Sequence, residues 1–523
     1  MFNFNSKKII LVFISMFVII SPAFAQSNDL GVIDFPTSGS PEAQKYFIRG
    51  VLLMHSFEYR DAGAEFKKAR EIEPGFAMAY WGEAMTHNHP VWNQQNKSAA
   101  KKIMKGLAST AEERMKKVPT QREKEYWRAL EVLYGDGDKI SRDYAYSEAM
   151  KQLYEKYPED LEAASFYALS TLGTVQGKRD FRTYVRSGAI AQEVFGKNPL
   201  HPGAAHYVIH SFDDPIHAPL GLKAARVYSN IAPDAPHALH MPSHIFMALG
   251  MWDDSASLNE RSAAAAFKKG QNGLHPTWWL HYTYLQQGRY EEARKLLAEV
   301  EKKMNQTNSR SYSRHAAYMR SSFIVETRNW REANIGNFDA SSLGTKAMAN
   351  VLLVNGFAAI EFEKIDKATK ILDQLKELIS TEQKSDDLEL VQLMHKELEA
   401  FIQFKMDNDN KALALLQDAI ALQDNMRFEF GPPIPVKPVH ELFGEVLLQL
   451  NQPEEAKREF KISLTQNSNR ALSLLGLARA NSALGDSEAS RKAYSELKEI
   501  WHNSDDLPEL QEINSKLVQV GSQ

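Results

Sequence analysis

The 523-residue chain contains no cysteine. Disulfide bonds, thiolate metal sites and cysteine nucleophiles are therefore excluded, and packing must stabilise the fold. The formal net charge of −4 is small for this length, and no basic stripe alternates with aromatic residues. These features argue against a nucleic-acid partner. Beyond the N-terminus no run is apolar enough to cross a bilayer, so we expect no transmembrane segment in the mature chain.

The N-terminus has the pattern of a secretory signal peptide. Lys7 and Lys8 precede an apolar run over residues 9–20, and Ala23-Phe24-Ala25 forms an A-x-A cleavage site. Such a run is too short and wrongly flanked for a membrane span. We therefore expect a mature chain that begins at Gln26 and is exported, to the periplasm or the medium.

Other absences narrow the function. No G-x-S-x-G elbow and no phosphate-binding glycine loop is present, so the sequence identifies no reaction. Period-two alternation of β-branched residues is almost lacking, which indicates an all-α chain. About five hundred mature residues exceed one compact core and imply several domains or a repeat stack.

A repeat is present. Gly50, Ala62, Phe66, Ala69 and Pro74 have the G…A-x3-F-x2-A…P spacing of the tetratricopeptide signature. Small residues let paired helices approach closely, the aromatic ring fills the gap, and proline ends the second helix. The spacing recurs with losses up to about residue 500, so most of the chain resembles the tetratricopeptide repeat family.

The resemblance implies an all-α solenoid, a right-handed superhelix of helix–turn–helix repeats. We expect a signal peptide over 1–25, an N-terminal extension over 26–42, a histidine-rich solenoid over 43–340, further repeats over 341–505 and a tail over 506–523. The proline-rich segment 431–438 cannot be helical and is expected to form a rigid loop, which can carry specificity.

The histidines are unevenly distributed. Nine of the sixteen lie between His201 and His281. Two pairs with a four-residue step, His206 with His210 and His240 with His244, are offset by thirty-four residues, which is the repeat period. Equivalent faces of neighbouring helices would therefore present four imidazoles to one place.

The resemblance implies that the first helix of each unit lines a concave groove. A stripe on such a helix steps by three and four residues. One stripe contains His206, His210 and Asp213, and the next contains His237, His240 and His244. We expect these five histidines to face one groove, and His275 to extend it.

A metal site is the leading hypothesis for this cluster. We expect His206, His210, His240 and His244 to hold a divalent transition metal (zinc, copper or iron), with Asp213 as a further ligand or a partner of the ligands. Neither pair is an HExxH zinc-protease motif, because Tyr207 and Met241 occupy the glutamate position. The alternative is that the histidines shape a groove without any metal.

Other side chains are candidates for ligand contacts in the groove. Glu441 and Glu445 form a carboxylate pair one turn apart, which could serve acid–base chemistry or be exposed charge. His87 and His89 cannot share a helical face and are expected at a loop or helix end. The full set of groove candidates is Trp81, His87, His89, His237, His275, Trp278, Tyr282, Glu441 and Glu445.

Three functions remain open at this stage. The first is an exported repeat protein that binds a protein, peptide or small molecule in its groove, with a metal site built from histidine. The second is a metal-dependent oxidoreductase or hydrolase that uses the same histidines, and the third is a metal-free interaction scaffold. The segments HPGAAHYVIH and HALHMPSHIF also resemble those of uncharacterised exported bacterial tetratricopeptide proteins, to which no substrate is attached.

Overall fold

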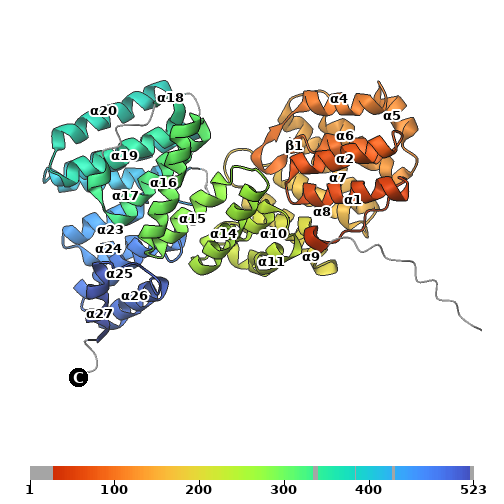
Figure 1. Cartoon of the computed structure of the whole chain (residues 1–523). Helices are drawn as coiled ribbons and strands as arrows, with labels where there is room; N and C mark the ends of the chain where they lie inside the picture. Colours follow the sequence, from red (N-terminus) through yellow and green to blue (C-terminus); the bar gives the residue numbers. More distant parts are fainter. Residues whose placement is uncertain (1–27, 334–339, 383–384, 427–429, 519–523) are drawn as a thin grey trace, which may run out of the picture.

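The computed structural model describes residues 28–333, 340–382, 385–426 and 430–518. Helices account for nearly all regular structure in these ranges (Figure 1). The prediction of an all-α chain is therefore confirmed. Strands occur in the described ranges only as a two-residue antiparallel ladder, in which Asn88 pairs with Gln95 and His89 with Gln94. The predicted signal peptide lies outside the described residues.

The N-terminal part contains the helices that precede the histidine-rich segment. Its elements are η1 (Asn28–Leu30), α1 (Pro41–His55), α2 (Tyr59–Ile72), α3 (Ala77–Met85), β1 (Asn88–His89), η2 (Pro90–Trp92), β2 (Gln94–Gln95), α4 (Lys97–Leu107), α5 (Ala111–Lys117), α6 (Gln121–Leu133), α7 (Lys139–Lys156), α8 (Leu161–Leu172) and α9 (Phe181–Lys197). Side-chain caps start several of these helices, and Thr110 and Thr120 each form a complete capping box.

The central and C-terminal parts continue the series of paired helices. The central elements are α10 (Pro202–Phe212), α11 (Ala218–Ile231), α12 (Pro236–His240), α13 (Pro242–Ala248), α14 (Trp252–Lys268), α15 (Leu274–Gln286), α16 (Tyr290–Thr307), α17 (Arg310–Thr327) and η3 (Trp330–Ala333). They are followed by α18 (Ala340–Leu343), α19 (Thr345–Glu361), α20 (Ile365–Thr381), α21 (Ser385–Lys405), α22 (Asp409–Gln423), α23 (Val439–Gln449), α24 (Pro453–Gln466), α25 (Ala471–Ala483), α26 (Ser487–Ile500) and α27 (Glu509–Val518).

Each helix packs mainly on its neighbours in the chain, which is the contact pattern of a solenoid. The tetratricopeptide spacing has the packing expected of it. The Phe66 ring fills the space that a Cβ on Gly50 or Gly82 would occupy, and Phe460 does the same between Gly444 and Gly476. An aromatic ring on a second helix thus seats against the first helices of two successive units, and the chain has a tetratricopeptide-type fold.

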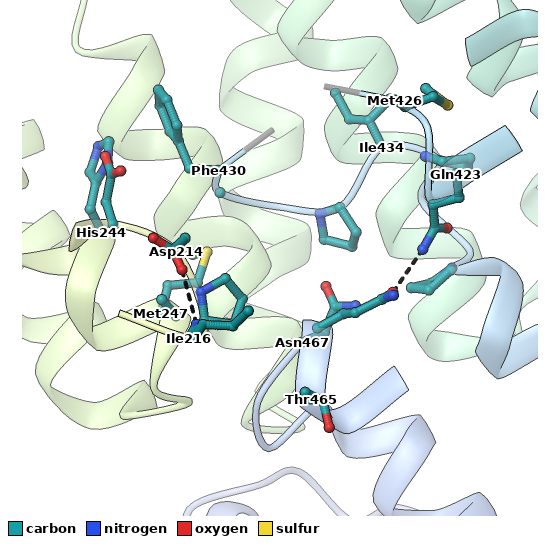
Figure 2. A pocket seen from close by; sticks show the side chains of 18 of the residues that line it. Asp214, Ile216, His244, Met247, Gln423, Met426, Phe430, Ile434, Thr465 and Asn467 are labelled. Atoms are coloured by element: carbon teal, nitrogen blue, oxygen red, sulfur yellow. Dashed lines mark hydrogen bonds and ion pairs between the residues drawn. The ribbon is translucent and has the colours of Figure 1, made fainter. Parts of the chain in front are cut away.

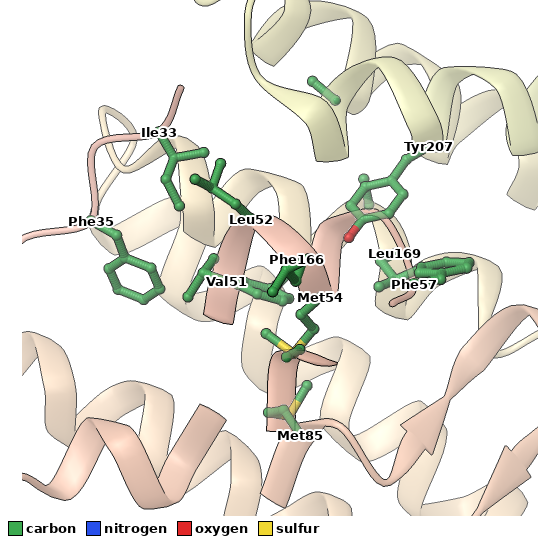
Figure 3. Packing of buried hydrophobic residues seen from close by; sticks show 14 of the residues in the cluster. Ile33, Phe35, Val51, Leu52, Met54, Phe57, Met85, Phe166, Leu169 and Tyr207 are labelled. Atoms are coloured by element: carbon green, nitrogen blue, oxygen red, sulfur yellow. The ribbon is translucent and has the colours of Figure 1, made fainter. Parts of the chain in front are cut away.

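The segment before the first repeat is part of the core. Ile33 and Phe35 are buried; Figure 3 shows Ile33 beside Leu52 of α1, and the Phe35 ring lies 5.3 Å from that of Phe47 on the same helix. The Val32 amide donates to the Leu200 carbonyl at 3.0 Å, which ties the segment to the start of α10. The predicted N-terminal extension therefore joins the first repeats to the histidine-rich repeats.

The C-terminal repeats return to contact the central ones. The Trp252 indole donates to the Asn469 carbonyl at 3.1 Å, and the Asn469 amide donates to the Gly250 carbonyl at 3.3 Å. Trp501 also donates to the Gln286 carbonyl at 3.0 Å. These bonds hold the turns of α13–α16 against α24–α26, which lie below them in Figure 1. The C-terminal repeats therefore fold back onto the central ones.

The C-terminal segment 506–523 and the proline-rich segment 431–438 can both be compared with their predictions. Residues 506–523 were expected to form a tail, yet they contain α27, whose Ile513 is buried against the last repeat. The described part of the proline-rich loop contains no helix, as expected.

None of the described helices combines the length and apolarity that a bilayer crossing requires. The predicted division at residues 340 and 341 stays a prediction.

Candidate metal centre

The histidine pairs lie on α10 and on the broken helix α12–α13. The break falls at Pro242, which has no N–H to continue the hydrogen-bond ladder. Met241 between the two segments keeps helical angles (φ −54°, ψ −38°). His240 and His244 therefore still project from one face, one turn apart, as His206 and His210 do on α10.

The structure divides the histidines into two groups. In the first triad, His206, His210 and His237, one ring nitrogen of each lies within 4.8 Å of the others. The Nδ1 of His206 donates to the His55 carbonyl at 2.7 Å, so the lone pair of the neutral ring is on Nε2. The buried Nε2 atoms of all three rings have no hydrogen-bond partner among the described residues.

The second triad comprises His240, His244 and His275, with the same 4.8 Å limit between ring nitrogens. The Nδ1 of His240 donates to Asn259 Oδ1 at 2.7 Å, and the Nδ1 of His244 donates to Asp213 Oδ2 at 3.2 Å. Both remaining lone pairs are therefore on Nε2, and these two Nε2 atoms lie 3.2 Å apart. The His275 ring, exposed to solvent, lies 4.6 Å from the His240 ring.

Asp213 connects the two triads. Its Oδ2 lies 3.5 Å from His210 Nδ1 in the first triad and 3.2 Å from His244 Nδ1 in the second. Arg179 donates to its Oδ1 at 2.7 Å. Burial alone would raise the pKa of Asp213, but the Arg179 guanidinium and the two histidine bonds hold it below its usual range. Asp213 is therefore an ionised acceptor that can orient a ring of each triad.

The four histidines of the two predicted pairs are buried, whereas the sequence placed them on a concave wall. His206 is fully buried, and His210, His240 and His244 are at most 4% exposed. Aromatic rings cover them. Phe57 and Trp92 contact His237 of the first triad, and Trp279 and Phe430 contact His244 of the second. Burial lowers the pKa of His206 and of His240 well below the usual value, which keeps both rings neutral.

A third histidine group has no free lone pair. Both His55 and His201 place Nε2 against the buried Glu162 carboxylate, at 2.7 Å and 3.0 Å. Their other ring nitrogens accept from the Tyr207 hydroxyl and from the Ala204 amide. All four nitrogens are engaged, so this group is a structural network that supports α1, α8 and α10 rather than a candidate metal site.

A cavity of about 480 Å³ borders the second triad. Figure 2 shows His244 and Asp214 on one side of it and Gln423 with Asn467 on the other. Residues from α13, from the loop after α10, from the proline-rich loop, from α21 and from the loop after α24 line its walls. The return of the C-terminal repeats thus encloses a space that ends on a triad histidine.

Several predicted groove residues lie elsewhere. Trp81 is 1% exposed and packs against Phe35 and Tyr126 in the N-terminal core, so it cannot contact a ligand in a groove. His87 and His89 were predicted at a loop or helix end; His87 follows the end of α3, and His89 belongs to the two-residue strand β1. The His89 ring stacks on Tyr59 at 4.0 Å and does not enter either triad.

Of the remaining groove candidates, some lie at the cavity and others are held in contacts elsewhere. Tyr282 lines the cavity, whereas Trp278 stacks on Tyr318 at 5.3 Å. Glu441 is fully buried, and Arg470 donates to both of its oxygens at 2.7 and 2.9 Å. Glu445 pairs with Lys437 at 2.7 Å. The two carboxylates are engaged in ion pairs and are not free for acid–base chemistry.

Several residues that orient or cover the triads were not among those predicted from the sequence. Arg179 bonds to Asp213, Asn259 bonds to His240, and Phe57, Trp279 and Phe430 cover triad rings. Trp279 carried a weak signal, since it follows Trp278 in the same unit. The others come from positions that repeat periodicity does not mark.

Comparisons with known proteins add little at the level of function. No family model and no curated protein matches the sequence. Among solved structures, a tetratricopeptide repeat protein from Parabacteroides merdae is 12% identical over 54% of this chain and 97% of its own, with a TM-score of 0.30. The human IFIT1 dimer with m7Gppp-AAAA is 13% identical, covers 90% and 91%, and has a TM-score of 0.37. The APC/C hetero-tetramer Cut9-Hcn1 is 10% identical, covers 93% and 79%, and has a TM-score of 0.30.

Proposed function

We propose that this chain is an exported tetratricopeptide-type protein that binds transition-metal ions at its two histidine triads. The observation that carries the proposal is the 3.2 Å approach of His240 Nε2 to His244 Nε2 while acceptors engage both Nδ1 atoms. Two lone pairs that face each other at this distance repel. A cation between them removes the repulsion and gains two neutral imidazole ligands.

The first triad supports the same function independently. One ring nitrogen of each histidine lies within 4.8 Å of the others, and all three buried Nε2 atoms have no partner among the described residues, which is costly for polar atoms unless something binds them. The donors in both triads are all imidazole nitrogens. This donor set suits zinc, copper or iron better than magnesium or calcium, which prefer oxygen ligands.

Metal analysis of the mature, untagged protein tests the proposal. We expect one ion per triad in the unaltered protein. His206→Ala should remove the ion of the first triad and His240→Ala that of the second, while the other triad keeps its ion. His281→Phe is the matched control, because His281 is also fully buried but lies outside both triads.

The outcomes separate the hypotheses. Equal metal content in all four proteins contradicts binding at the triads and places the metal elsewhere. No metal in the unaltered protein after growth with zinc, copper and iron contradicts the proposal and leaves a metal-free interaction scaffold. Loss of both ions in either single variant would instead indicate one shared site.

A metal-dependent enzyme is the second candidate function. Each triad supplies three protein ligands, and catalytic sites keep an open position beyond three such ligands. The cavity that ends on His244 gives a ligand a route to the second triad. A change in the visible spectrum of the copper- or cobalt-loaded protein on addition of azide, absent in His240→Ala, would support an open position there.

Export is a separate part of the proposal and rests on the N-terminal sequence alone. N-terminal sequencing of the protein from its native host tests it. A chain that begins at Gln26 supports export, and a chain that retains Lys7 and Lys8 contradicts it.

A further inference from the structure

The cavity beside the second triad has walls that select among ligands by charge. Its described lining includes the carboxylates of Asp213, Asp214 and Asp424 but no lysine or arginine. Arg179 lies behind Asp213 and Asp214, paired with both at 2.7 and 3.4 Å, and is itself buried. Its charge is therefore compensated by two carboxylates, and among the described lining residues negative charge is in excess.

The same walls are mostly apolar and rich in aromatic and sulfur-containing side chains. The residues that give this character are Met247, Trp252, Tyr282, Leu393, Met426 and Phe430. Aromatic faces and thioethers contact aromatic ligands favourably, and aromatic faces also attract cations. A volume of about 480 Å³ is that of a small-molecule site.

The mouth of the cavity is apolar as well. Ile216 is 69% exposed and Phe181 is 42% exposed, and both line the cavity. Large apolar side chains gathered at the rim of a cavity mark binding sites more often than chance exposure. The Ile216 amide donates to Asp214 Oδ1 at 3.1 Å, which fixes the rim beside the acidic wall.

Polar groups are few and lie at the two ends. His244 is at one end, and at the other the Gln423 amide donates to Gln466 at 2.7 Å beside Asn467. The Tyr282 hydroxyl is already engaged with Arg470 at 2.8 Å. A ligand with an aromatic body and one terminal polar group matches this distribution.

We propose that this cavity binds arylalkylamines and arylalkyl alcohols and rejects arylalkyl carboxylates. The inference rests on the proposed function in that the ligand lies next to the metal of the second triad. Three probes with the same ring and similar length test it: 2-phenylethylamine, 2-phenylethanol and phenylacetate. Titration calorimetry of the mature protein, both metal-loaded and chelator-treated, measures their affinities.

We expect the amine and the alcohol to bind at least about tenfold more tightly than the carboxylate, because each like-charge contact disfavours the anion. Ile216→Arg places a cation at the exposed rim and should weaken amine binding at least about tenfold while favouring the carboxylate. Leu220→Arg is the matched control, because Leu220 is 53% exposed on α11 and does not line the cavity.

Failure of this inference is distinct from failure of metal binding. If the carboxylate binds as tightly as the amine, or if none of the probes binds, the ligand assignment is overturned even when the metal content is as proposed. The same holds if Leu220→Arg acts like Ile216→Arg. If the probes bind as expected but the protein holds no metal, the cavity assignment stands and the metal proposal fails.

Discussion

Asn259 fixes the tautomer of His240. The Asn259 amide nitrogen donates to the Ser255 carbonyl at 2.9 Å, which turns its Oδ1 toward His240 Nδ1 at 2.7 Å. His240 must therefore donate from Nδ1 and keep its lone pair on Nε2. The same logic applies to His244 through Asp213. Asn259 and Asp213, which accept hydrogen bonds from Nδ1 of the two rings, thus determine that the lone pairs of His240 and His244 are on Nε2.

The first prediction concerns Asp213, which contacts one ring of each triad. Asp213→Asn should lower metal affinity at both triads by about 10–100-fold, the usual effect of losing a partner that orients a ligand. Competition with a chromophoric chelator measures it. Asp214→Asn is the control, since Asp214 pairs with His217 and Arg179 but contacts neither triad. An equal loss of metal affinity in both variants would contradict the role of Asp213 in orienting one ring of each triad.

The second prediction uses the tryptophan that stacks on the second triad. The rings of Trp279 and His244 lie 4.4 Å apart. Copper(II) held by His244 should quench the fluorescence of Trp279, because a paramagnetic ion at this range shortens the excited state. Trp279→Phe should bind copper but lose the share of the quenching that comes from Trp279, while Trp92 beside His237 still reports copper in the first triad. Trp127→Phe, altered in the N-terminal core, should keep the full quenching. Unchanged quenching in Trp279→Phe would place the copper elsewhere.

The third prediction tests the close approach of α10 to α1. A Cβ on Gly203 would overlap the His55 ring, which Tyr207 and Glu162 hold in place. Gly203→Ala should lower the free energy of unfolding by about 1–3 kcal/mol, as overpacking does. A Cβ on the exposed Gly196 of α9 would have no atom within 4 Å, so Gly196→Ala should raise the free energy of unfolding by about 0.5–1 kcal/mol. Urea denaturation midpoints measure both, and a stabilised Gly203→Ala would contradict the packing.

The fourth prediction contrasts two buried glutamates. Burial raises the pKa of Glu397 well above its usual value, and its carboxyl has no hydrogen-bond partner among the described residues. Burial would also raise the pKa of Glu441, but Arg470 and Lys437 hold it low. Glu397 is therefore protonated in the folded chain, while Glu441 is ionised.

Replacing each glutamate with glutamine should therefore change the free energy of unfolding in opposite directions. Because the folded pKa of Glu397 is raised, its contribution to stability is full below the unfolded pKa of about 4.3 and declines as the pH rises. Glu397→Gln should raise the free energy of unfolding by about 1–2 kcal/mol at pH 8 and change it little at pH 4. Glu441→Gln should lower it by about 3–5 kcal/mol at pH 8, since it breaks a buried pair. Urea denaturation at pH 4 and pH 8 measures both effects. A Glu397→Gln effect that does not depend on pH would contradict a protonated Glu397 in the folded chain.

Much of the architecture was readable from the sequence. The glycine and phenylalanine spacing predicted paired helices, and the packing of Phe66 between Gly50 and Gly82 has that form. The histidine spacing also predicted that His206 and His210 share one helical face and that His240 and His244 share another. These inferences succeed because they depend on local geometry: helical periodicity and the shape of one repeat are set by residues close in the chain.

The arrangement of the site was not readable in this way. The sequence placed four histidines around one ion on a concave wall, whereas the structure buries them in two separate groups, which the half-buried His237 and the exposed His275 complete. The division depends on ring orientation. That orientation is set by acceptors from other units, such as the His55 carbonyl for His206 and Asn259 for His240.

The sequence by itself therefore determined the helices, their pairing and the supply of imidazoles, because each of these follows from spacing along the chain. Only the tertiary structure decided which lone pairs converge and what encloses them. The bond from Trp252 to Asn469 joins residues far apart in sequence and holds the loop after α24 against Trp252, which lines the cavity beside His244. No periodic pattern encodes such a contact, since the small rotation between successive repeats accumulates over many units before the chain meets itself.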